Sequence, residues 1–139
     1  MASINITTNR KEIEIIRDGE KVGVIYFSPS DTSIIARMNE AKTTMENTKI
    51  NADGNSTTEE LIAEMKRVDG IIRDALDYSF GYPVSDVVFG SGFTFSTADG
   101  VSAVEQFLDG AMDYIKKAMS EEAKKAKARQ DKYLKNYKK

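Results

Sequence analysis

The chain has 139 residues, 40% hydrophobic and 30% charged, which favours one folded domain with one core. It contains no cysteine and no histidine, which excludes disulfides, zinc thiolates, cysteine nucleophiles and histidine-based triads. We therefore expect a protein that is not an enzyme and that needs no metal or cofactor. No apolar run approaches about 18 residues, and the N-terminus has no secretory signal, so we expect a cytoplasmic location without membrane association.

Charge is distributed unevenly along the chain. Residues 1–115 carry 10 Lys/Arg and 19 Asp/Glu, a net of −9, whereas residues 116–139 carry 10 Lys/Arg and 3 Asp/Glu, a net of +7. An acidic body followed by a basic segment is therefore concealed within the overall net charge of −2.

Residues 12–27 predict a β-hairpin. The run Glu12-Ile13-Glu14-Ile15 alternates charged and apolar side chains, as a half-buried strand does, and a second apolar run ends at Phe27. Asp18-Gly19 lies between the two runs, and both residues tolerate the positive φ of a type I′ turn. Gly23, within the second run, is a candidate for a β-bulge.

Two amphipathic helices are predicted next, over residues 31–47 and 57–79. Ser30 or Asp31 is the expected cap of the first helix. The second helix begins at a capping box, Ser56-Thr57-Thr58-Glu59, in which Ser56 would accept from the Glu59 amide. Its expected apolar stripe consists of Leu61, Ile62, Met65, Val68, Ile72, Ala75 and Leu76.

A short apolar insert separates the second helix from the last one. It reads Phe80-Gly81-Tyr82-Pro83-Val84-Ser85-Asp86-Val87-Val88-Phe89-Gly90. Hydrophobic side chains and turn residues dominate it, so we expect it to hold other protein segments. Ser85 is the expected cap of a single helical turn. We expect Phe80 and Phe89 to be buried, because a turn-rich segment needs buried aromatic residues to stay ordered.

The last predicted helix spans residues 97–118, with Ser96 or Thr97 as its cap. We expect residues 119–139 to form a basic helical or disordered tail, because apolar positions become sparse there: Ala123, Ala126, Tyr133, Leu134 and Tyr137. The elements together predict an α+β fold. Residues 1–118 would form a single domain in which the hairpin packs on a mainly helical bundle.

The internal methionines admit two interpretations: Met38, Met45, Met65, Met112 and Met119. Most of them fall on or beside the apolar stripes, which favours core packing. The alternative is an adaptable groove for a partner helix. Other motifs are weaker. Gly90-Ser91-Gly92 lacks the context of a phosphate loop, and Glu59, Glu60 and Glu64 fit a solvated helix face better than an acid–base pair.

The order of elements resembles the tail assembly chaperones of long-tailed bacteriophages, the family of the lambda G protein. In that family a helix ending near Phe-Gly is followed by a short segment ending in Ile/Val-Phe-Gly and then by a terminal helix. The resemblance covers about residues 70–115. The residues that carry it are Asp74, Leu76, Phe80, Gly81, Asp86, Val88, Phe89, Gly90, Phe107 and Leu108. The N-terminal half, from the first helix to the loop after it, matches no motif of the family.

The resemblance implies a non-catalytic assembly factor that binds the long, helical tape measure protein and keeps it soluble during tail assembly. It also implies a longer, frameshifted form that recruits the tail tube protein. The ending Lys138-Lys139 fits the shorter form. We expect a homo-oligomer. The candidate protein-interaction residues are Phe80, Tyr82, Val88, Phe89, Phe107, Lys124, Lys125, Lys127 and Arg129.

Two other classes remain open. The basic tail is compatible with a nucleic-acid-associated or regulatory phage protein, although acidic residues interrupt it and nucleic acid is not the expected partner. The tail is also compatible with a solvated helix face or with an arm for an acidic protein surface. A small enzyme that uses carboxylates is the least favoured class.

Overall fold

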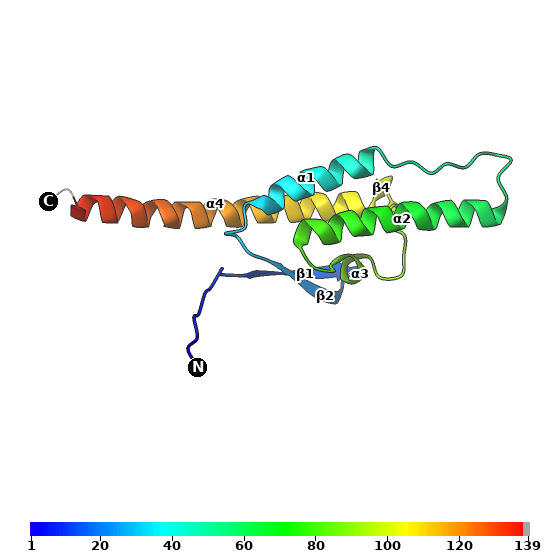
Figure 1. The fold of residues 1–139 in the computed structure, drawn as a ribbon. Helices are drawn as coiled ribbons and strands as arrows, with labels where there is room; N and C mark the ends of the chain where they lie inside the picture. The colour runs from blue at the N-terminus through cyan, green and yellow to red at the C-terminus, as the bar shows by residue number, and fades with distance from the viewer. Residues whose placement is uncertain (138–139) are drawn as a thin grey trace.

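A computed structural model describes residues 1–137 of the chain, and Lys138 and Lys139 lie outside the described residues. The elements in chain order are β1 (Lys11–Arg17), β2 (Glu20–Phe27), α1 (Ser33–Glu46), α2 (Thr58–Phe80), α3 (Ser85–Phe89), β3 (Thr97–Ala98), β4 (Val101–Ser102) and α4 (Ala103–Tyr137). The β1–β2 hairpin and α3 lie on one side of the long helices α2 and α4, and α1 lies on the other (Figure 1). The predicted α+β class is confirmed.

The N-terminal hairpin forms as its sequence predicts. Asp18 and Gly19 both have positive φ, 51° and 81°, which suits the tight turn between two twisted strands. The pairing steps from Ile15 opposite Gly23 to Ile16 opposite Lys21, so a bulge lies beside Gly23. A Cβ atom on Gly23 would lie 2.5 Å from the Val87 side chain, so the glycine also permits close approach of α3 to β2.

The helices and the hairpin bury one common core. Ile25 of β2, Ile34 and Met38 of α1, Leu76 of α2 and Ile115 of α4 are almost fully buried. Helices α1 and α2 make the most extensive helix–helix contact. A buried polar link joins them, because Ser79 Oγ donates to the carbonyl oxygen of Arg37 at 3.2 Å, and Arg37 Nε donates to that of Ser79 at 3.0 Å.

The helix starts differ from the predicted caps. The capping box is displaced by one residue, because Thr57 rather than Ser56 is the N-cap of α2 and its hydroxyl accepts from the Glu60 amide at 3.1 Å. Helix α1 has no side-chain cap at Thr32. The carboxylate of Asp31, one of the two predicted caps, accepts from the amide of Ser33, the first residue of α1, at 3.2 Å. Both helices still begin within two residues of the predicted positions.

The insert folds back onto the end of α2. Gly81, with a φ of 79°, ends α2 in the left-handed conformation that favours glycine. Ser85 does not cap α3 with its own side chain, contrary to the sequence prediction. The Asp77 carboxylate accepts from the amides of Val84 and Ser85 instead, each at 2.8 Å. Arg73 adds a second link, because it donates to the carbonyl oxygens of Gly90 and Gly92.

The predicted start of the last helix at residue 97 is wrong. Residues 97–102 form a second, very short hairpin, β3–β4, whose turn residues Asp99 and Gly100 have φ values of 52° and 81°. Helix α4 therefore begins at Ala103, where Ser102 Oγ accepts from the Glu105 amide at 3.2 Å. Asp99-Gly100 is the same dipeptide that identified the first hairpin, so the sequence also contained the signal for this second turn.

Two helix ends extend beyond the body (Figure 1). The first turns of α2 do so, and the predicted apolar stripe is wrong there, because Leu61 and Ile62 are 41% and 44% exposed. At the other end, α4 continues through the basic segment to Tyr137, which resolves the alternative between helix and disorder up to that residue. Its sparse apolar residues Ala123, Ala126, Tyr133 and Leu134 are exposed.

Candidate protein-binding groove

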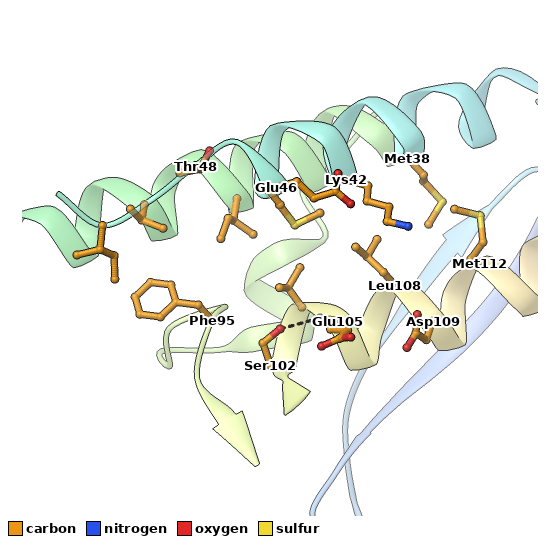
Figure 2. A pocket seen from close by; sticks show the side chains of 15 residues that line it. Met38, Lys42, Glu46, Thr48, Phe95, Ser102, Glu105, Leu108, Asp109 and Met112 are labelled. Carbon is orange, nitrogen blue, oxygen red and sulfur yellow. Dashed lines mark hydrogen bonds between the residues drawn. The ribbon is translucent and has the colours of Figure 1, made fainter. Parts of the chain in front are cut away.

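An open apolar groove lies between α1, α2 and the first turns of α4 (Figure 2). It has a volume of about 570 Å³. We call it the methionine groove, because Met38, Met45 and Met112 line it together with the aliphatic residues Ile50, Val68, Ile72, Val104 and Leu108 and with Phe95. This size and apolar lining are typical of a site that binds another molecule.

Helical spacing places these side chains on facing surfaces. Met38, Lys42 and Met45 lie on one side of α1, and Val104, Leu108 and Met112 follow one another at intervals of four along α4. Met38 is fully buried, whereas Met45 and Met112 are half-buried. Met38 therefore packs in the core and borders the groove, and Met45 and Met112 line its open part, whereas Met65 and Met119 do not line it.

Charged residues border the groove. Glu105 and Asp109 lie on the α4 side, and Lys42 and Glu46 lie on the α1 side (Figure 2). Among the residues that the structure describes, none of these four forms a salt bridge within 4 Å. The groove thus combines an apolar floor with a net acidic border.

The insert residues proposed for protein interaction are mostly part of the core. Phe80, Val88 and Phe89 are only 8%, 8% and 6% exposed. Phe107 of α4 lies between the two phenylalanines, with ring centroids 5.9 Å from Phe80 and 6.1 Å from Phe89. Three of these residues also reach a second groove of about 510 Å³ between β1 and α4: Val88, Phe89 and Phe107. The expected anchoring of the insert by Phe80 and Phe89 agrees with their burial.

Tyr82 connects the insert to the hairpin. Its ring stacks on Tyr26 with centroids 4.3 Å apart, and its hydroxyl accepts from the Tyr26 amide at 2.7 Å. Burial raises the pKa of the Tyr82 hydroxyl, and the hydrogen bond from the Tyr26 amide opposes part of that rise. The Tyr82 hydroxyl therefore satisfies a backbone N–H group of β2, and this contact is structural in this fold.

The basic candidates lie apart from the aromatic ones. Lys124, Lys125, Lys127 and Arg129 are exposed on the part of α4 that projects from the body. The structure therefore does not bring the two predicted sets of interaction residues into one site. The methionine groove itself was indicated only through its methionines. Glu105 and Asp109 were missed, although their spacing of four within the last helix places them on one face.

Comparisons with known proteins identify no relative: no family model, curated protein or solved structure matches this chain. Within residues 1–137, no cluster of three or more acidic side chains has the geometry to hold a metal ion. No helix in that range combines the length and the apolar character needed to cross a membrane.

Proposed function

We propose that this chain is a tail assembly chaperone of a long-tailed bacteriophage that binds a helical segment of the tape measure protein in the methionine groove. The observation that carries the proposal is the groove itself, an open apolar channel lined by flexible methionine side chains. The protein would act without catalysis in the cytoplasm of the bacterial host. A longer, frameshifted form would recruit the tail tube protein.

The chemistry of the groove suits an amphipathic helix. Methionine has three rotatable bonds and a polarisable sulfur, so a surface containing it adapts to different apolar side chains. Half-buried Met45 and Met112 face the opening from α1 and α4. A client helix that places apolar residues at every third or fourth position would bury them there and would no longer associate with other client helices.

The proposal can be tested by co-expressing the full chain with a helical fragment of the tape measure protein from the same genome. The fragment should be soluble with the wild-type chain and should precipitate with the Met45→Asp variant, because a carboxylate would then lie on the apolar floor. Ile62→Asp is the matched control. Ile62 is 44% exposed on α2 and does not line the groove.

Thermal melting checks that both variants fold, and both should melt within a few degrees of the wild type. If the Met45→Asp variant keeps the fragment soluble as well as the wild type does, the methionine groove is not the client site. If the wild-type chain itself does not solubilise the fragment, the chaperone proposal is wrong.

The alternative function is that of a nucleic-acid-associated or regulatory phage protein. Its support is the projecting basic part of α4, in which Lys124, Lys125, Lys127 and Arg129 are all exposed. Binding through phosphate contacts weakens steeply with salt. A gel shift with duplex DNA or single-stranded RNA that appears at low salt and disappears at high salt would favour this alternative. An absence of any shift at low salt would exclude it.

A further inference from the structure

The projecting part of α4 contacts the core of its own chain at Met119, where it begins, and then extends into solvent. We call residues 119–137 the distal segment, which is about 27 Å long at 1.5 Å per residue. Nearly all of its described side chains are exposed, and only Met119 and Glu122 are half-buried. Helices in proteins draw most of their stability from packing an apolar face. A helix of this length in solvent therefore suggests a surface on another molecule.

The distal segment has one sparsely apolar side bordered by basic residues. Met119, Ala123, Ala126 and Tyr133 recur at intervals of four, three and seven, so they share one side of the helix, with Gln130 among them and Glu122 at its edge. At about 100° per residue, Lys127 and Arg129 lie on the two borders of that side. Lys124 and Lys132 lie on the opposite side. A basic border of this kind is complementary to an apolar groove with an acidic border.

The methionine groove has an apolar floor and one acidic border. Its α4 border carries Glu105 and Asp109, and neither forms a salt bridge among the described residues. From Val104 to Met112 its floor is about 12 Å long, which matches about eight residues of a docked helix. The distal segment of the same molecule cannot enter it, because α4 forms the groove with its first turns and then runs away from it (Figure 1).

We propose that the distal segment of one copy docks into the methionine groove of a second copy. Because Lys127 and Arg129 lie on opposite borders of the docking side, one of them would face Glu105 and Asp109 on the α4 border of the neighbour, and the small side chains of Ala123 and Ala126 would let the helix approach the apolar floor. The contact joins two different surfaces, so it repeats head to tail and produces rings or open chains. It does not depend on the proposed function, but it implies that a client helix and a neighbouring copy compete for one groove.

Charge exchange in the full chain tests this contact. Analytical ultracentrifugation at low salt should show self-association of the wild type. The groove variant Glu105→Lys/Asp109→Lys and the tail variant Lys127→Glu/Arg129→Glu should each weaken it by about tenfold or more, since each places like charges opposite one another. Two variants serve as matched controls with the same charge changes. They are Glu12→Lys/Glu20→Lys on the hairpin and Lys124→Glu/Lys132→Glu on the opposite side of α4.

The decisive measurement is a mixture of the groove variant and the tail variant. Each supplies the surface that the other has reversed, so the mixture should regain the association that both variants lack alone, which also shows that both are folded. A wild-type chain that stays monomeric at high concentration overturns the proposal. So does a mixture that fails to associate, or a control on the opposite side of α4 that weakens association as much as the tail variant does. No client is present, so these results are independent of the client-binding test.

Discussion

The Asp77 carboxylate holds Ser85 by two hydrogen bonds, one from the Ser85 amide at 2.8 Å and one from its hydroxyl at 3.1 Å. The amide of Val84 donates to the same carboxylate. The last full turn of α2 therefore supplies the N-terminal cap of α3. This relationship fixes the direction of the insert and brings Val88 and Phe89 into the core.

Replacing Asp77 should destabilise the protein through loss of this cap. We expect Asp77→Ala to lower the free energy of unfolding by about 1–2 kcal/mol, as removal of a helix cap does. Urea denaturation measures the change. The matched control is Asp74→Ala, one turn earlier on α2, because Asp74 is exposed and alanine favours helix. Equal losses in both variants would show that the Asp77 bonds contribute no stability.

Gly23 should tolerate alanine only when Val87 is shortened. The added Cβ would lie 2.5 Å from Val87 Cγ1, so Gly23→Ala alone should cost about 1–3 kcal/mol through overpacking. In a Val87→Ala background the same change should be neutral or stabilising, because alanine suits a strand better than glycine. A double-mutant cycle by thermal denaturation measures the coupling. Additive effects would contradict the close approach of α3 to β2.

Phe89→Ala should remove a large share of the stability, about 3–5 kcal/mol, because Phe89 is 6% exposed and packs against Phe107. Phe93→Ala is the control, since Phe93 stacks on Phe95 but is only half-buried, and its loss should be smaller. If Phe89→Ala leaves the melting temperature unchanged and abolishes partner binding, then Phe89 is an interface residue and its assignment to the core is wrong.

Acid should weaken the start of α1. Hydrogen bonds from Ser33 and Arg37 hold the pKa of Asp31 below its ordinary value. An unfolded aspartate has a pKa of about 3.9, so this stabilisation is complete above that pH and is lost as the pH falls through the lower folded value. Asp31 is partly exposed, so the effect should be below about 1 kcal/mol. Comparing the pH dependence of unfolding in the wild type and in Asp31→Asn measures it. Identical slopes below pH 4 would contradict it.

Removal of residues 119–139 should change the melting temperature by only a few degrees. The described side chains of this segment lie outside the core, apart from Met119, which packs partly against it. Circular dichroism during heating measures the transition. If the shortened chain is unfolded, the segment contributes to the body in a way that its exposure does not indicate.

Local chemistry in the sequence was enough to predict most of the elements. The Asp18-Gly19 turn identified the first hairpin, and the helical spacing of residues such as Ile72 and Leu76 identified α2. The start of α4 was misplaced because Ser96 and Thr97 offered caps earlier than Ser102, while the turn at Asp99-Gly100 went unused. These features depend on neighbours a few residues apart, so the sequence contains the information directly.

Only the tertiary structure decided which apolar residues are core and which remain open. Leu61 and Phe89 are both apolar residues in helices, yet Leu61 is 41% exposed and Phe89 is 6% exposed. That difference depends on which elements pack against each side chain, and periodicity within one helix does not contain this information. The methionine groove arises in the same way, because residues of α1 and α4 more than 50 positions apart become its walls only after the chain has packed. The sequence by itself determined most of the elements and the charge asymmetry, and packing determined where an apolar groove stays open.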